Sequence, residues 1–489
     1  MADFLKRLTP LQATWLLVVL GSIVRLVASM NVGLGTDEAH YALYGLHLDS
    51  SYYDHPPMIG WLQAIVLQIA DSDLAMRVMP ALLFAATALV LHRVTVTFFP
   101  NDTPWLGFIS VALLQSGVMF QLIGLSMLPD GPLLLLGMIS LLVLHGVLNH
   151  GRLRDWLWLG LLLGLAGLSK YTAITLVFTV LLALRPRGIV IALRGAGPWL
   201  AILVASLTIM PVLYWNYSHD WISFAYQLHH GTANPDWSVT RAALAQFAQL
   251  LSYGPGIFVF GLVAIVASAR EWREQGVWLC LALAVPVLAL FGWNSGYQMT
   301  LPHWASLGWA GLIPLIARWL QRNWERRWVR VSTAVSAVYA LLLSAIIFSE
   351  FFMPWLPFKD NGNPLRDLYG WQQAAQRAEE LRDEIAATPG TAPLLFTESW
   401  TYASRLAWYG RPSSVQVLDT RYDQFDIWFG SPQDGVRGIL VVWPEQKSAP
   451  ATGGAGQFAE CALRDTLPVI ANGHLVSTFT FYACHDYHR

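Results

Sequence analysis

The sequence predicts an all-α polytopic membrane domain followed by a small α/β domain, and three observations carry that prediction. Hydrophobic residues make up 55% of the 489-residue chain and charged residues 12%, whereas soluble domains have about 45–50% and about 25%. Apolar runs of roughly 20 residues, long enough to span a bilayer, recur up to residue 350. Beyond that point the sequence is more polar and alternates strand-like and helical segments. We therefore expect a membrane domain over 1–350 and an α/β domain over 351–489.

About eleven apolar segments are candidate transmembrane helices, and the two on either side of Lys170 are the shortest. The candidates cover residues 12–31, 75–97, 104–125, 131–149, 156–169, 172–185, 196–215, 242–268, 276–293, 301–319 and 331–349. A cleaved signal peptide is the alternative for the first segment, because Lys6 and Arg7 precede its apolar run. Arg25 interrupts that run, so we keep the segment as a retained span.

Basic residues in the short loops predict the orientation of the chain, because cytoplasmic loops carry the excess of Lys and Arg. Alternate loops are rich in arginine, and the remaining loops are nearly bare. The rich loops contain Lys6, Arg7, Arg93, Arg152, Arg154, Arg185, Arg187, Arg194, Arg270, Arg273, Arg318, Arg322, Arg326, Arg327 and Arg330. With an odd number of spans, a cytoplasmic N-terminus places the first loop, 32–74, and the C-terminal tail on the opposite side.

The tail has the pattern of a small domain on that outer side. Proline, glycine and asparagine between 354 and 364 indicate a linker, and residues 371–388 have a charged helical pattern. Short strands are predicted at 393–396, 415–418, 438–443 and 475–480. Cys461 and Cys484 both lie in the tail, where an oxidising compartment is compatible with a disulfide, whereas Cys280 lies in a span as a packing residue.

The first outer loop opens with two acids, Asp37 and Glu38, directly after a span. One interpretation is a helix start, with Thr36 as its N-cap and the acids favoured by the helix dipole. In a chain so short of charge, however, ionisable groups at the membrane edge usually face a cavity and mark function. The pair is therefore a candidate catalytic site.

Further polar groups recur at the same membrane edge. Asp54 and His55 precede two prolines that stiffen the loop where it returns to the membrane, and Asp130 lies in a proline-glycine turn between spans. Lys170 and Tyr171 interrupt an apolar run, where the lysine either reaches the headgroups or binds an anion. Solvated turns are the alternative interpretation of the loop residues.

Histidines gather on the predicted outer side. They are His40, His47, His55, His219, His229, His230 and His303. Histidine together with Asp or Glu suits zinc, but the spacings His-Glu-x-x-His and His-x-x-Glu-His do not occur in the sequence. A divalent metal therefore stays an open alternative, and the sequence requires no cofactor. Nucleic acid is not expected as a partner, because the net charge is −1 and no basic domain stands out.

A set of short motifs, taken in order, resembles one family. The motifs are Asp37-Glu38-Ala39-His40-Tyr41, Asp54-His55-Pro56-Pro57, Arg77-Val78-Met79-Pro80, Pro129-Asp130, Leu168-Ser169-Lys170-Tyr171, Thr397-Glu398-Ser399-Trp400-Thr401-Tyr402 and Arg421-Tyr422-Asp423-Gln424-Phe425-Asp426. They resemble the GT-C membrane glycosyltransferases, and most of all glycosyltransferase family 39, which contains the protein O-mannosyltransferases and the aminoarabinose–lipid A transferases. The resemblance is close over about the first 310 residues and looser in the tail.

The resemblance implies a GT-C fold and a sugar donor carried on polyprenyl (undecaprenyl) phosphate in a bacterial inner membrane. The sequence agrees with this, since it has no glycine-rich phosphate loop and no soluble nucleotide-binding domain. The acceptor is expected to be lipid A, another envelope glycan or a protein on the periplasmic face, so lipopolysaccharide modification is one expected role. The sugar stays open because His55 replaces the lysine that aminoarabinose transferases have in Glu-Lys-Pro-Pro.

For the reaction, we expect Asp37 to act as the base on the acceptor hydroxyl, with Glu38 supporting it, in a single displacement that inverts the anomeric centre. The groups expected to bind the donor phosphate are Lys170, Tyr171, His55 and Arg77, and those expected to bind sugar or acceptor are Asp54, Asp130, His229, His230 and His303. A transporter or flippase of lipid-linked sugars is the main alternative, but the sequence shows no internal repeat. A non-catalytic scaffold leaves the acidic pair unexplained.

Overall fold

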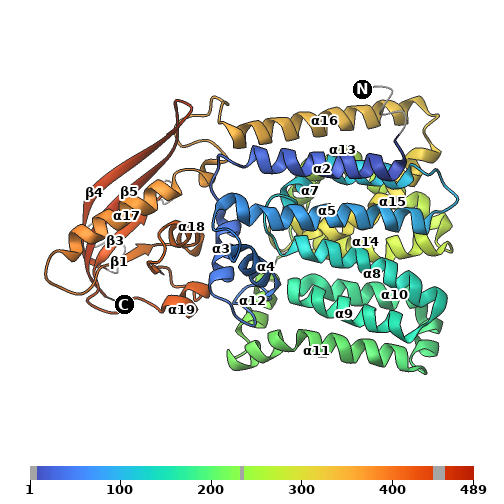
Figure 1. The fold of residues 1–489 in the computed structure, drawn as a ribbon, viewed down its shortest axis with the longest axis horizontal. Coiled ribbons are helices and arrows are strands. Elements are labelled where there is room, and N and C mark those ends of the chain that lie inside the picture. The colour runs from blue at the N-terminus through green and yellow to red at the C-terminus, as the bar shows by residue number, and fades with distance from the viewer. Residues whose placement is uncertain (1–7, 232–235, 444–457, 489) are drawn as a thin grey trace. The chain divides into compact units, whose positions relative to one another are not determined.

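The computed structural model describes residues 8–231, 236–443 and 458–488, and Figure 1 shows its course as a ribbon. The expected positions Lys6 and Arg7 lie outside these residues. The chain divides into two compact units. The first, the helical unit, comprises residues up to 26, 50–59 and 77–346, and the second, the mixed unit, comprises 27–49, 60–76 and 347 onward. The expected division at residue 350 stays a prediction.

The helical unit is built from helices joined by short loops. Its helices, in chain order, are α2 (Pro10–Ala28), α5 (Asp73–Phe98), α6 (Leu106–Ser116), α7 (Val118–Ile123), α8 (Asp130–His150), α9 (Leu153–Ser169), α10 (Ile174–Ala192), α11 (Ala196–Ser218), α12 (Ile222–Gly231), α13 (Val239–Ser268), α14 (Gln275–Asn294), α15 (Ser306–Arg322) and α16 (Arg327–Phe352). Short 3-10 turns, η1 (Tyr171–Ala173), η2 (Ala269–Glu271) and η3 (Pro302–Ala305), lie between them.

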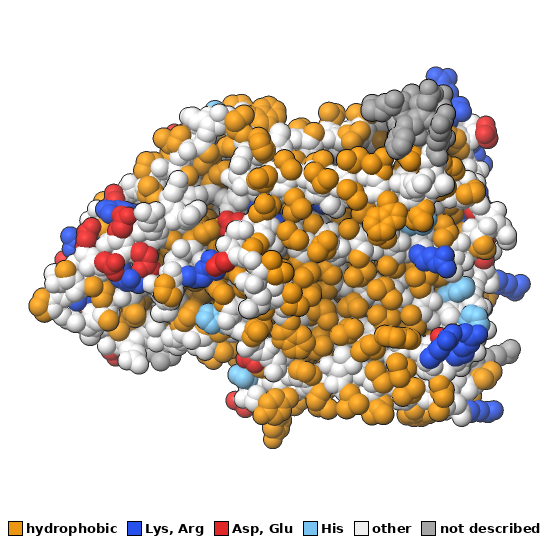
Figure 2. All heavy atoms as spheres, viewed as in Figure 1, with side chains coloured by type: hydrophobic (Ala, Val, Ile, Leu, Met, Phe, Trp, Pro, Cys, Tyr) orange, Lys and Arg blue, Asp and Glu red, His pale blue; other side chains and the backbone are white. Residues whose placement is uncertain are grey.

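Each of the eleven expected spans corresponds to a helix or to a broken pair of helices. Among the described residues, seven helices are long and apolar enough to cross a membrane: α2, α5, α8, α11, α13, α14 and α16. The remaining expected segments are shorter or interrupted, as α6 and α7, α9, η1 and α10, and α15. The chain is a multi-pass membrane protein, and Figure 2 shows the apolar surface of its helices, with Lys and Arg gathered at one end.

One expected span, 104–125, is broken into α6 and α7 at Gly117, whose backbone is extended. The break is spanned by a buried cation. The Arg25 guanidinium donates to the side-chain oxygens of Gln115 and Gln121, one on each side of Gly117. These hydrogen bonds pair the Arg25 guanidinium with both glutamine oxygens inside the apolar unit, where an unpaired charge would cost free energy.

Helices α9 and α11 pack closely because small residues line their contact. An added Cβ at Gly160 would lie 2.4 Å from the Ala201 carbonyl oxygen, and one at Gly164 would lie 2.5 Å from Thr208. The spacing of these two glycines is the small-xxx-small pattern that lets membrane helices approach. This contact fixes the position of α9, which ends at Ser169, directly before Lys170.

The mixed unit contains a five-stranded sheet. Its strands are β1 (Leu394–Thr397), β2 (Val415–Val417), β3 (Gly438–Val442), β4 (Phe458–Ala471) and β5 (His474–Tyr487), in the order β2-β1-β3-β5-β4. The first three are parallel, and β5 runs antiparallel to β3 and β4. The helices of the unit are α3 (Thr36–Leu46), α4 (Met58–Leu67), α17 (Trp371–Ala386), α18 (Trp400–Tyr409) and α19 (Gln424–Phe429). The predicted α/β character of the tail is confirmed.

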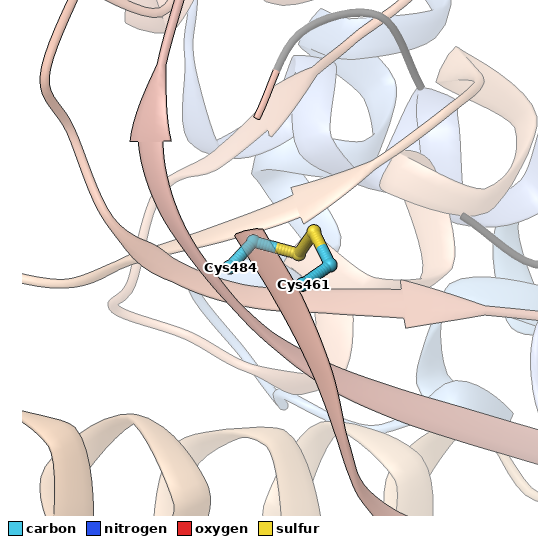
Figure 3. Close-up of a disulfide and its surroundings, with 2 residues drawn as sticks. All are labelled: Cys461 and Cys484. Atoms are coloured by element: carbon cyan, nitrogen blue, oxygen red, sulfur yellow. A yellow bond between two sulfur atoms is a disulfide. The ribbon is translucent and has the colours of Figure 1, made fainter. Parts of the chain in front are cut away.

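Strand β4 was absent from the sequence-based expectation. It is an edge strand with most side chains exposed, and it carries charges and Pro468, features that edge strands tolerate and buried strands do not. Cys461 of β4 lies directly opposite Cys484 of β5, and the two form a disulfide (Figure 3). Cys280 is buried within α14, as its interpretation as a packing residue requires.

Candidate functional site

A buried ion pair lies at the end of the helical unit away from the arginine-rich loops. Helix α9 ends at Ser169, and Lys170 has an extended backbone that turns the chain into η1. The Lys170 Nζ donates to both carboxylate oxygens of Asp130, at 2.9 and 2.7 Å. Asp130 opens α8, so its charge also faces the positive end of that helix. Lys170 is 6% exposed and Asp130 1% exposed.

A third predicted residue joins this pair. The His303 Nε2 lies 3.9 Å from the Asp130 Oδ2, and His303 belongs to η3, between α14 and α15. The hydroxyl of Tyr253 donates to the neighbouring Pro302 carbonyl and so holds the turn in place. The structure therefore brings together Lys170, Asp130 and His303 from three separate connections. We call this set the ion-pair cluster.

The loop with the two prolines is fixed by α12. The Gln227 amide donates to the Asp54 carbonyl at 2.6 Å, and the rings of Tyr53 and Tyr226 lie 4.8 Å apart. The His55 Nε2 lies 4.0 Å from the Asp54 carboxylate. Helix α12 also binds the segment after Lys170, because its Ser223 hydroxyl is 2.6 Å from the Tyr171 hydroxyl. Loop 50–57 and η1 are thus held by one helix.

Three other predicted residues of the helical unit belong to α5 and α12. Arg77 is buried in α5. His229 is exposed on α12, where its Nδ1 lies 2.7 Å from the Ala225 carbonyl of the same helix. His230 belongs to α12, but its side chain lies outside the described part of the chain. No group of three His, Cys, Asp or Glu that could hold a metal ion occurs among the described residues.

The acidic pair lies in the mixed unit, at the start of α3. Thr36 was expected as the N-cap, but the structure differs: Gly35 is the N-cap, and its backbone N–H donates to the Glu38 carboxylate at 3.0 Å. Glu38 is buried and closes the helix start, whereas Asp37 is half-buried. Glu38 therefore has a structural partner that shapes the turn carrying Asp37.

The tail holds this turn in place, which the sequence did not indicate. The Tyr409 hydroxyl of α18 accepts from the Leu34 N–H at 2.7 Å and donates to the Asp73 carboxylate at 2.6 Å. The backbone N–H of Gly33 donates to the Leu368 carbonyl at 3.0 Å. Residues separated by more than 300 positions thus fix the segment before α3, and contacts this distant leave no local pattern.

An apolar groove is lined by Tyr171, the residue that follows Lys170. It has a volume of about 510 Å³ and lies between α9, α10 and α11. Its lining is almost wholly apolar, including Leu163, Val177 and Ile202, and its polar end is Tyr171. A single long hydrocarbon chain with a polar group at the Lys170 end matches this distribution.

Comparisons with known proteins agree with the fold and the motifs. The family "Dolichyl-phosphate-mannose-protein mannosyltransferase" matches residues 54–215. The lipid A galacturonosyltransferase RgtD of Rhizobium johnstonii is 28% identical over 419 residues, which cover 82% of this chain and 84% of that protein. These matches confirm the expected resemblance to membrane glycosyltransferases.

Two crystal structures of ArnT from Cupriavidus metallidurans share the fold. The structure bound to undecaprenyl phosphate has a TM-score of 0.62 at 15% identity and covers 95% of this chain and 97% of ArnT. The apo structure has a TM-score of 0.59 at 14% identity, with 96% and 97% covered. At this identity the likeness concerns the fold, and the predicted GT-C architecture is confirmed.

Proposed function

We propose that this chain is a membrane glycosyltransferase that moves a sugar from undecaprenyl phosphate to lipid A on the periplasmic face of a bacterial inner membrane. The GT-C fold and the similarity to membrane glycosyltransferases support this proposal. The observation that carries the proposal is the juxtaposition of a buried lysine with an apolar groove at the end of α9. That combination suits a lipid with one phosphate and one long chain. A nucleotide sugar has no long hydrocarbon chain that could occupy such a groove.

The donor phosphate is assigned to Lys170, with Tyr171, His55 and Arg77 as further contacts. An ammonium group has three N–H donors, and the hydrogen bonds to Asp130 use two directions, so one donor is left for a phosphate oxygen. Asp130 then acts by orienting the lysine, in place of the direct sugar contact expected from the sequence. The undecaprenyl chain lies along the groove between α9 and α11.

The acceptor is assigned from the curated relative, whose name states that it transfers galacturonate to lipid A. Lipid A is therefore the first acceptor to test, and undecaprenyl-phosphate-linked galacturonate is the first donor. Another envelope glycan or a protein is a weaker candidate. The transporter alternative has no observation in its favour.

The proposed reaction is a single displacement at the anomeric carbon. Asp37 takes the proton of the acceptor hydroxyl as the new carbon–oxygen bond forms. The bond between the anomeric carbon and the phosphate oxygen breaks, and undecaprenyl phosphate leaves with the electron pair. Lys170 stabilises the charge that develops on this leaving phosphate. Glu38 maintains the helix start that carries the base, and Asp54 and His303 orient hydroxyl groups.

The experiment compares transfer and donor binding in three variants of the full chain. Asp37→Asn is expected to lower turnover at least a hundredfold while donor binding is retained, because only the base is lost. Lys170→Gln is expected to weaken donor binding as well as turnover. The control is Asp155→Asn, which removes an acid near the opposite end of α9 and should change neither. Normal turnover of Asp37→Asn excludes Asp37 as the base.

A further inference from the structure

A second apolar groove lies at the arginine-rich end of the helical unit. It is bordered by α6, α13, α15 and α16 and has a volume of about 600 Å³. Along α6 it extends from Trp105 to Ser116, and it ends at the kink of α13, where Gly254 has a φ of 84° before Pro255. Eleven helical residues cover roughly 16 Å, about half of the ~30 Å hydrocarbon core. The groove is therefore as long as one leaflet.

The arginine-rich end of this groove carries unbalanced positive charge. Arg326, Arg327 and Arg330 lie at the start of α16, whose first turn contains no acid. None of the three forms an ion pair with another described residue, and their side chains are exposed. Cations at a helix start are unfavourable because the dipole is positive there. An anion bound between these arginines would relieve that repulsion.

The neighbouring arginines on α15 differ from these three because they form ion pairs. Arg318 and Arg322 of α15 are paired with Asp102, Glu271 and Glu274 at 2.8 to 3.6 Å. The three carboxylates neutralise the positive charge of these two arginines. The only acid in the connection to α16 among the described residues is Glu325, which lines the groove, and one acid against three arginines leaves a net positive charge there.

Arg330 shares one face of α16 with the residues that line the groove, whereas Arg326 and Arg327 line a separate hollow with Trp328 and Val331. Arg330 lies one turn before Thr333, which is followed by Ala337 and Ala340 at helical spacing along the groove wall. The Thr333 hydroxyl and the Gln321 side-chain oxygen both line the groove and are buried without a hydrogen-bond partner among the described residues. Trp324 and Trp328 are exposed beside them, as aromatic residues are at a headgroup boundary.

We propose that this groove binds an anionic glycerophospholipid. Its phosphate lies between Arg326, Arg327 and Arg330, and an acyl chain lies along α6 and α13. The headgroup and ester oxygens supply partners for Thr333, and headgroup hydroxyls supply donors for Gln321. The donor lipid of the proposed reaction does not fit, because its phosphate belongs beside Lys170, at the other end of the helices. Assignment to the inner leaflet rests on the proposed orientation, but binding itself does not.

The test is native mass spectrometry of the full chain in detergent, with phosphatidylglycerol and phosphatidylcholine as the probes. The chain is expected to retain phosphatidylglycerol at least tenfold more tightly than phosphatidylcholine. The variant R326Q/R327Q/R330Q should lose that preference. The matched control R152Q/R154Q/R194Q removes three exposed arginines from other loops of the same end and should keep it. Equal binding of the two lipids, or equal loss in both variants, overturns the proposal.

Two further arms separate a lipid from a soluble anion. Ala337→Phe places a ring in the groove and should shorten retention of phosphatidylglycerol while the arginines stay intact. Glycerol 1-phosphate, which has the phosphate but no acyl chain, should not displace the lipid at millimolar concentration. Displacement by glycerol 1-phosphate shows a phosphate site without a lipid groove and contradicts the proposal. Since the readout is lipid binding, its failure is distinct from a failure of sugar transfer.

Discussion

Lys170 and Asp130 illustrate what one buried ion pair does in an apolar surrounding. Removing two charges from water is costly, and the cost is offset only when the geometry is good and both partners remain. The two short hydrogen bonds between them meet that condition. Either charge left alone would be buried without compensation. The pair therefore holds Lys170 in one position, and each partner depends on the other.

This dependence gives a prediction for stability. Asp130→Asn should destabilise the folded chain by about 3–5 kcal/mol, because Lys170 loses its counter-charge. The double variant K170Q/D130N should recover most of that loss while transfer stays absent, since the phosphate contact is gone. Thermal unfolding in detergent, followed by tryptophan fluorescence, measures the first effect, and a transfer assay measures the second. A double variant as unstable as the single one contradicts the account.

Asp423 provides a pH-dependent prediction in the mixed unit. Burial is the largest cause that raises the pKa of this carboxyl, to about 6, and Asp426 and Asp419 add repulsion. The folded state therefore holds the proton up to about pH 6, whereas the unfolded chain releases it near pH 4. Stability from this group is present below pH 4 and is lost as the pH rises to 6.

Asp423→Asn should accordingly raise the free energy of unfolding at pH 7.5 by about 1–3 kcal/mol, seen as a higher melting temperature, and leave it unchanged near pH 4. Asparagine can still accept the hydrogen bond from the Phe425 N–H that starts α19. The control is Asp465→Asn, where a hydrogen bond from Arg377 lowers the pKa, so no gain is expected at neutral pH. A destabilised Asp423→Asn at pH 7.5 would falsify the assignment.

At the scale of elements, α3 is positioned by α18. The Tyr409 hydroxyl forms hydrogen bonds with both Leu34 and Asp73. Leu34 lies three residues before Asp37, the acid proposed as the base. Tyr409→Phe removes both hydrogen bonds and should lower stability by about 1–2 kcal/mol. It should also reduce kcat severalfold while KM for the donor is unchanged, because Asp37 is less well oriented.

Tyr482→Phe on β5 is the matched control, since its ring is half-buried in the same unit and it has no role at α3. A purely structural role for Tyr409 predicts lost protein with normal kcat per folded molecule. Normal kcat in the folded fraction of Tyr409→Phe therefore contradicts the positioning role. If added lipid restores the activity of Tyr409→Phe to that of the unsubstituted chain, the positioning role is contradicted as well.

Some of the helices and strands could be predicted from the sequence, and others could not. Helices such as α8 and α14 follow from apolar length alone, and β1, β2, β3 and β5 follow from short apolar runs. The break at Gly117 and strand β4 do not, because one depends on Arg25 bonding across a helix end and the other on edge exposure. Lys170 and Asp130 were each recognised, but their pairing was not, since they lie 40 residues apart.

At the scale of the whole molecule, the arginine-rich loops predict that the ion-pair cluster lies on the periplasmic side. A membrane-impermeant maleimide tests this in intact spheroplasts. Asp54→Cys and Ser399→Cys should be labelled without breaking the membrane, whereas Ala269→Cys, after α13, should be labelled only after lysis. Cys280 is buried and Cys461 and Cys484 are bonded, so the background should be low. The reverse labelling pattern contradicts the proposed orientation and the mechanism that depends on it.

Sugar transfer from a lipid carrier is the central claim, and the stoichiometry of products tests it most directly. The purified chain is reconstituted in liposomes with labelled undecaprenyl-phosphate galacturonate and lipid A, and both products are measured by mass spectrometry. The account predicts one undecaprenyl phosphate released for each sugar added to lipid A, with both products lost in Asp37→Asn. Donor that crosses the bilayer intact, with no undecaprenyl phosphate released and no gain in the mass of lipid A, contradicts the claim.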